Sequence, residues 1–82
     1  MTIFLLEYEP KTGMIVSLTQ YSEHERDAAM KQRLRLEKAN ALAGREREVA
    51  LLEAVTESAL RATHSRYFKS VKELADAASP GS

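Results

Sequence analysis

His64 is the residue whose surroundings come closest to those of a catalytic or ligand-binding group. On a helix it shares a face with Leu60, Tyr67 and Phe68, at spacings of three and four residues. Beside Arg66 and Tyr67, an imidazole is suited to act as a general base or to contact an anion. The same pattern is typical of a half-buried histidine that packs against apolar neighbours, and we expect that structural role. A small-ligand or enzymatic site around His64 is the alternative.

The stretch from residue 58 to residue 72 is basic, because its charged residues are arginines and lysines with no acid among them. Basic side chains interleaved with aromatic ones can hold a nucleic-acid backbone and stack on bases. Both aromatics fall on the Leu60 face, however, which we expect in the core, so the arginines are more simply a solvated face. Nucleic-acid binding is therefore a second hypothesis, and we expect none that is tight and sequence-specific. The candidate contacts for a nucleic acid or small ligand are Arg61, His64, Arg66, Tyr67, Lys69 and Lys72.

Sequence motifs of catalysis and metal binding are absent. The chain has no glycine-rich phosphate loop, no HExxH and no nucleophile elbow. It has no cysteine, and its two histidines, His24 and His64, are forty residues apart, so no metal-ligand set of the usual spacing exists. We therefore expect no catalytic residue, no metal and no cofactor, in a protein that is not an enzyme.

Composition and charge place the chain among ordinary globular proteins. Of its 82 residues 44% are hydrophobic, and 12 basic residues balance 12 acidic ones, so no net field attracts a nucleic acid or an anionic membrane. The absence of cysteine fits a reducing compartment. Residues 1–7 lack the charged start and apolar length of a signal peptide, and no run reaches the length of a membrane span. We expect a cytoplasmic protein without membrane contact.

Three short runs have the composition of β-strands. Residues 2–8 and 14–19 are rich in aliphatic and aromatic side chains, and the segment between them contains Pro10 and Gly13, which predicts a β-hairpin. Residues 48–53 form a third apolar run, too brief for a helix and flanked by charge. We therefore expect a third strand there.

Two helices are indicated by their start and stop signals. Ser22 and Glu25 have the spacing of a capping box, and Gly44 suits the left-handed position after a helix end, so we expect a helix from Glu23 to Gly44. Thr56 offers a capping oxygen for a second helix that should run to about Phe68.

The elements follow one another in the order ββαβα, with a short third helix predicted over residues 71–78 from the capping pair Ser70 and Glu73. A right-handed helical crossover places the first strand between the other two, in the order 2-1-3 with all neighbours antiparallel. The fold class is then α+β, a three-stranded antiparallel sheet with helices packed on it, as in half of a ferredoxin-like fold. Residues 1–78 should form a single domain and residues 79–82 a disordered tail.

The predicted sheet carries more apolar surface than one layer of helices covers. Ile3 and Leu5 alternate with Phe4 and Leu6, so both faces of the central strand are apolar. If both helices pack on one face, the other is left with an apolar centre formed by Ile3, Leu5 and Ile15, and such a patch usually marks an interface.

The first predicted helix has two apolar stripes. Met30, Leu34 and Ala41 lie on one, and an alanine-rich set lies on the other. One stripe can meet the sheet while the other meets the second helix or a partner. The candidate interface residues are Ile3, Leu5, Ile15, Ala29, Leu36, Ala39 and Ala43.

These patterns favour a small non-enzymatic protein-interaction or regulatory module that acts as a homodimer. Its functional surface is expected to be the second face of the sheet or the outer stripe of the first helix. The expected partner is a second copy of the chain, and a different protein is the alternative.

Overall fold

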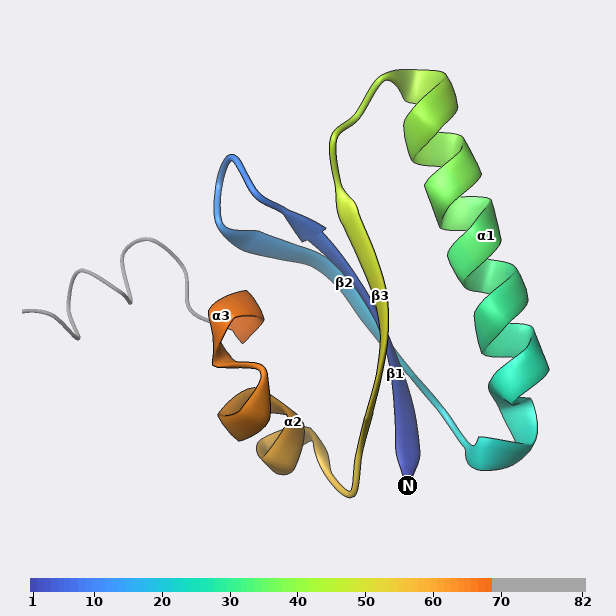
Figure 1. The fold of residues 1–82 in the computed structure, drawn as a ribbon, viewed down its shortest axis with the longest axis vertical. Helices are drawn as coiled ribbons and strands as arrows, with labels where there is room; N and C mark the ends of the chain where they lie inside the picture. Colours follow the sequence, from blue (N-terminus) through green and yellow to red (C-terminus); the bar gives the residue numbers. More distant parts are fainter. Residues whose placement is uncertain (69–82) are drawn as a thin grey trace, which may run out of the picture.

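The first two strands are long and form a hairpin (Figure 1). The computed structural model describes residues 1–68 of the chain. β1 spans Thr2–Glu9 and β2 spans Met14–Tyr21. Gly13 closes the turn between them with φ 69°, a left-handed conformation that glycine adopts without steric cost, and its backbone N donates to the Glu9 carbonyl at 2.9 Å.

β3, Glu48–Ala54, pairs with the other side of β1. The sheet order is β2-β1-β3, and β1 is antiparallel to both of its neighbours. The predicted α+β class, the three strands and their order 2-1-3 are therefore confirmed.

The long helix begins and ends where the sequence predicts. Its first turn, Glu23–Glu25, is a 3-10 helix (η1), and α1 continues over Arg26–Ala43. The backbone N of Ser22 donates to the Glu25 carboxylate at 3.0 Å, which satisfies one free amide at the helix start. Gly44 follows with φ 68°, in the left-handed conformation that ends the helix.

The second predicted helix is two short helices, so the prediction of one helix to Phe68 was wrong. α2 spans Glu57–Thr63 and α3 spans Ser65–Phe68, with His64 between them at φ −121° and ψ 45°. The Thr63 hydroxyl donates to the Ala59 carbonyl at 2.9 Å, a local bond that competes with the regular helical ladder. The predicted third helix and tail, residues 71–82, lie outside the described residues.

α2 and α3 pack on the face of the sheet that carries Phe4 and Tyr8. Phe4 and Leu60 are at most 1% exposed and meet in the core. The rings of Tyr8 and Tyr67 stand edge to face with their centroids 5.2 Å apart. The other members of this core are Leu18, Leu52, Ala54, Ala59 and Phe68.

α1 lies on the opposite face, as Figure 1 shows. Side chains alternate along a strand, so Ile3, Leu5 and Glu7 point away from the Phe4 face. Asn40 of α1 hydrogen-bonds Glu7 there. Ile3 and Leu5 are each 1% exposed. Because α1 covers this face while α2 and α3 cover the other, the expected open apolar face does not exist, and Ile3 and Leu5 are core residues of the single chain.

A β-bulge moves Ile15 away from Ile3 and Leu5. Leu6 pairs with Leu18 and Glu7 with Ser17, but the next residue of β1, Tyr8, pairs with Ile15. Val16 is the extra residue, and it reverses the alternation of side chains in the first part of β2. Ile15 is therefore half-buried on the Tyr8 side of the sheet, and its grouping with Ile3 and Leu5 was wrong.

Candidate interaction surface

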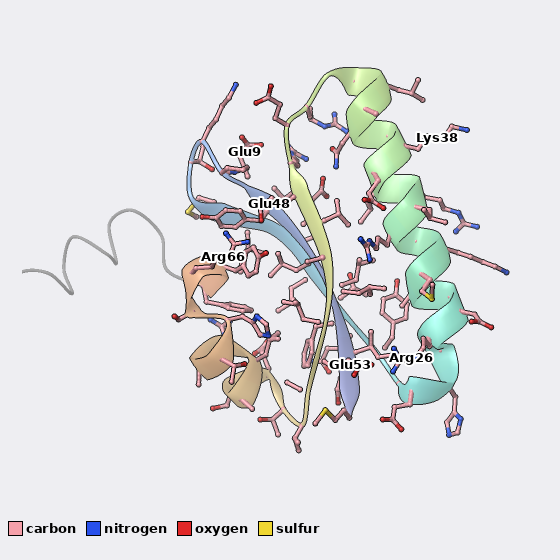
Figure 2. All side chains as sticks on the ribbon, viewed as in Figure 1. Glu9, Arg26, Lys38, Glu48, Glu53 and Arg66 are labelled. Atoms are coloured by element: carbon pink, nitrogen blue, oxygen red, sulfur yellow. The ribbon has the colours of Figure 1, made fainter. Side chains whose placement is uncertain are left out.

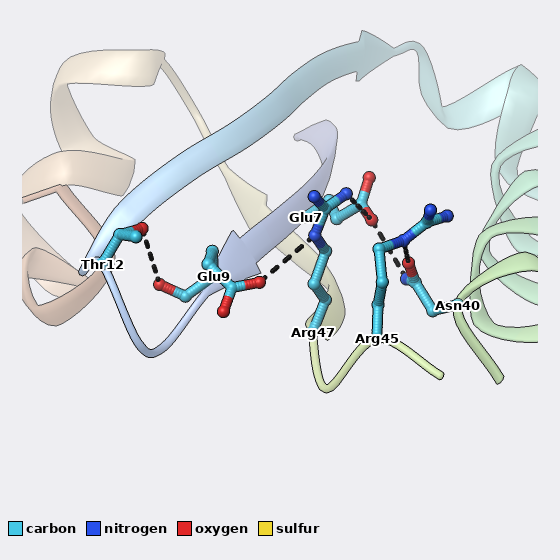
Figure 3. Close-up of polar contacts among 6 residues, drawn as sticks. All are labelled: Glu7, Glu9, Thr12, Asn40, Arg45 and Arg47. Carbon is cyan, nitrogen blue, oxygen red and sulfur yellow. Dashed lines mark hydrogen bonds and ion pairs between the residues drawn. The ribbon is translucent and has the colours of Figure 1, made fainter. Parts of the chain in front are cut away.

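A buried polar cluster joins α1 to the sheet (Figure 3). Glu7 is 5% exposed and Asn40 is 4% exposed. The Asn40 side-chain amide donates to Glu7 Oε2 at 3.0 Å, and Arg47 Nη1 donates to the same oxygen at 3.2 Å. A second nitrogen of Arg47, Nε, donates to Glu9 Oε2 at 3.3 Å, and Arg45 Nε donates to Asn40 Oδ1 at 3.0 Å.

This cluster has the properties of a structural element. Within residues 1–68, no fully buried side-chain nitrogen or oxygen lacks a hydrogen-bond partner. The Glu7 carboxylate is compensated by the Arg47 guanidinium, and Asn40 fills the remaining space with two matched bonds. The cluster therefore fixes the C-terminal end of α1 and the entry to β3 against β1.

The sequence interpretation missed the cluster. Two signals were present: Glu7 interrupts an apolar strand on the Ile3 and Leu5 side, and Asn40 falls on the inner stripe of α1 four residues after Leu36. Neither signal identifies Arg47 as the partner, because that contact spans forty residues of sequence.

Two of the predicted ligand contacts, Arg66 and Tyr67, lie on α3. Arg66 donates to the Tyr67 hydroxyl and, at 3.0 Å, to Glu48 of β3, and its guanidinium lies 4.2 Å from the Tyr67 ring centre (Figure 2). The hydrogen bond to Tyr67 raises the pKa of Arg66. Tyr67 itself is only 8% exposed because it packs on Tyr8.

Arg61 and His64 are the other members of the predicted contact set that the structure describes. Arg61 is exposed, 3.8 Å from Glu57 in an ion pair, and its guanidinium lies 4.7 Å from the Phe68 ring centre. His64 is half-buried at the end of α2, where its backbone N donates to the Leu60 carbonyl at 2.9 Å. Lys69 and Lys72 lie outside the described residues. The structure thus places Arg61, His64, Arg66 and Tyr67 on one continuous segment formed by α2, His64 and α3.

The outer surface of α1 carries exposed apolar side chains. Met30, Leu34 and Leu42 are 51%, 66% and 80% exposed. They follow at intervals of four and eight residues and lie, with Lys38 and Ala41, on the side of the helix that faces away from the sheet, as Lys38 shows in Figure 2. We call Met30, Leu34, Lys38, Ala41 and Leu42 the outer α1 surface.

The alanine-rich stripe of α1 is the inner one. Ala29 is fully buried and Leu36 is half-buried, both toward the sheet, whereas Ala39 and Ala43 are exposed at the margins of that contact. Ala29 is therefore used within the chain, and its assignment to an interface between chains was wrong. The assignment of Leu36, Ala39 and Ala43 stays a prediction. The stripe left for a partner is that of Met30, Leu34 and Ala41.

The two edges of the sheet differ in charge. β2 has no charged residue from Met14 to Tyr21, and Met14 and Val16 are 53% and 44% exposed. β3, at the other edge, carries Glu48 and Glu53, each of which forms an ion pair with an arginine of a neighbouring helix (Figure 2).

Residues 1–68 contain no group of three or more side chains able to hold a metal ion. Over the same residues, no helix has the length and apolar character required to cross a membrane. No protein-family model, curated protein or solved structure matches the chain.

Proposed function

We propose that the chain is a small non-enzymatic protein-interaction or regulatory module that works as a homodimer and binds a partner protein through the outer α1 surface. The observation that carries this proposal is the exposure of Leu34, 66%, beside Met30 and Leu42 on a helix whose other side already packs on the sheet. Apolar side chains gathered on one face, with a polar rim, usually mark a binding surface.

The spacing of these side chains indicates how a partner would bind. Anchors that recur every three to four residues on one helix face are typical of a helix that inserts into an apolar groove or packs along a second helix. Lys38 lies in the same row, and its long aliphatic stem can cover apolar surface while its ammonium group stays in water. The partner is expected to offer an apolar groove with an acidic margin.

Two other functions receive less support. For nucleic-acid binding, base stacking needs accessible rings, but Tyr67 is 8% exposed and packs on Tyr8. Arg61 and Arg66 are each paired with a glutamate, which lowers the positive charge they offer to a phosphate. For a ligand or enzymatic site, His64 has no side-chain hydrogen bond to a carboxylate within residues 1–68 that would orient it as a base.

A cytoplasmic location is part of the same proposal. It is supported by the absence of cysteine in a small domain, which is usual in a reducing compartment.

The test is a matched pair of substitutions on α1. The tagged chain retrieves partners from its native host, and calorimetry then measures the affinity of the purified partner for wild-type, Leu34→Glu and Thr12→Glu chains. Leu34→Glu should weaken binding at least about tenfold, whereas Thr12→Glu, which adds the same charge at an exposed residue of the hairpin turn, should change it much less. Circular dichroism checks that both variants fold. Equal affinities for all three chains would contradict the proposal.

A further inference from the structure

We propose that two copies of the chain join through the open edges of β2, in antiparallel orientation, so that their three-stranded sheets become one continuous sheet of six strands. This inference rests on the proposed homodimer and specifies its contact. It assigns self-association to the sheet edge and leaves the outer α1 surface to a different partner.

β2 carries little of the protection that sheet edges usually have. An edge strand presents unpaired backbone amides and carbonyls, and monomeric proteins block it with charges, proline, β-bulges, covering segments or very short strands. In β2 the bulge at Val16 affects only the first part of the strand and leaves Ser17–Tyr21 regular. β2 is eight residues long, and the sequence MIVSLTQY has no charge, no proline and no glycine. β3, at the opposite edge, shows the protected form, because Glu48 and Glu53 are held by Arg66 and Arg26.

The helices leave this edge accessible. α1 packs on β1 and β3, and α2 also packs on β3. Of the described helices, α3 packs on β2, on the Tyr8 side of the sheet. Beyond β2, no described strand continues the sheet. A second strand can therefore approach β2 from outside without displacing α1.

The uncharged sequence of β2 allows this strand to pair with a second copy of itself. A two-fold axis perpendicular to the sheet pairs β2 with an antiparallel β2, and no like charges meet in any register because the strand has none. The regular part of the strand, Ser17–Tyr21, follows the bulge at Val16. Centred on Thr19, the pairing sets Thr19 against its own copy, Leu18 against Gln20 and Ser17 against Tyr21.

The polar side chains of β2 can stay in contact with water when two copies pair along this strand. Thr19 and Gln20 are exposed and Ser17 is half-buried, and Ser17 and Thr19 lie on the α1 side of the sheet. Hydroxyl side chains tolerate water there, so the middle of a joined sheet needs no further helix to cover it. Thr–Thr contacts between opposite strands are among the favourable pairs on a sheet surface.

The test compares two matched threonine-to-lysine substitutions by sedimentation velocity over a range of concentrations. Thr19→Lys places like charges opposite each other at the two-fold axis, and it should raise the dimer dissociation constant at least about tenfold. Thr12→Lys, in the exposed hairpin turn, adds the same charge away from the edge and should leave the dimer unchanged. Leu34→Glu on α1 should also leave it unchanged.

The remaining outcomes are decisive as well. A wild-type chain that stays monomeric at high micromolar concentration overturns both the edge contact and the homodimer, while partner binding through α1 is judged separately by calorimetry. A dimer that survives Thr19→Lys and is lost in Leu34→Glu overturns the edge contact and leaves the homodimer standing. If Thr19→Lys does not fold, hydrogen exchange of the wild-type chain decides: slowing of β2 amides with increasing concentration supports the proposal, and its absence overturns it.

Discussion

The side-chain amide of Asn40 lies 3.0 Å from Glu7 Oε2, and this hydrogen bond connects the last turns of α1 to the central strand. Both residues are almost completely buried. The contact explains why α1 covers the Ile3 and Leu5 face of the sheet: a carboxylate in that position has to be paired, and Asn40 together with Arg47 provides the pairing.

Removing Arg47 should destabilise the fold more than removing the neighbouring Arg45. Arg47→Met leaves the Glu7 carboxylate buried without its charged partner, and we expect a loss of about 2–3 kcal/mol in the free energy of unfolding, less than for a fully buried pair because Arg47 is 26% exposed. Arg45→Met removes one hydrogen bond at an exposed side chain and should cost about 1 kcal/mol or less. Urea unfolding of both variants measures the difference, and equal losses would argue against the role assigned to Arg47.

The combined variant Glu7→Gln with Arg47→Met should recover part of that stability, because the neutral side-chain oxygen at position 7 can still accept the Asn40 hydrogen bond. Removing both charges of a buried ion pair leaves no uncompensated charge in the core. The same urea measurement checks this, and a double variant less stable than Arg47→Met alone would count against the explanation.

Tyr67 should behave as a core residue. Tyr67→Ala removes a ring that packs on Tyr8 and is 8% exposed, and we expect a loss of about 3 kcal/mol in the free energy of unfolding. Tyr67→Phe keeps the ring and loses only the hydroxyl that Arg66 contacts, so its cost should be about 1 kcal/mol or less. A Tyr67→Ala chain as stable as wild type would mean that α3 does not pack on the sheet in solution.

The start of the long helix should weaken in acid. A hydrogen bond from the Ser22 backbone amide lowers the pKa of the Glu25 carboxyl, so the folded state favours the charged form. The resulting stabilisation is present above the unfolded-state pKa and is lost as the pH falls through the lower folded-state pKa. Glu25→Gln should therefore show a smaller drop in melting temperature than wild type between neutral pH and pH values below about 4. Parallel melting curves for the two chains would contradict this.

Local signals in the sequence were sufficient for the three strands and the long helix. Gly44 adopts the left-handed conformation that its position predicts, Gly13 lies in the turn of the predicted hairpin, and Thr56 Oγ1 accepts the Ala59 amide at 3.1 Å as a helix cap. Each of these depends on a few neighbouring residues, so sequence reasoning can identify it. The order of the strands was predicted from a right-handed crossover with the third strand placed beside the first, and the structure has that order.

Non-local relationships were not predictable in the same way. A central strand that is apolar on both faces, with Ile3 opposite in direction to Phe4, is compatible with helices on one face or on both. The contact between Glu7 and Asn40, which spans 33 residues of sequence, belongs to the structure with helices on both faces and could not be read from the sequence. The bulge at Val16 has no glycine or proline to mark it, so the move of Ile15 to the other face could not be inferred. Both stripes of α1 are apolar in the sequence, so the exposure of Leu34 became clear only when the structure showed which stripe faces the sheet.

The most direct test of the account is the mass of the wild-type chain in solution. Light scattering coupled to gel filtration should give about twice the 9.2 kDa chain mass at micromolar concentrations and a decrease toward the single-chain mass on dilution. A single-chain mass at every concentration up to the high micromolar range would contradict the proposal that this protein works as a homodimer.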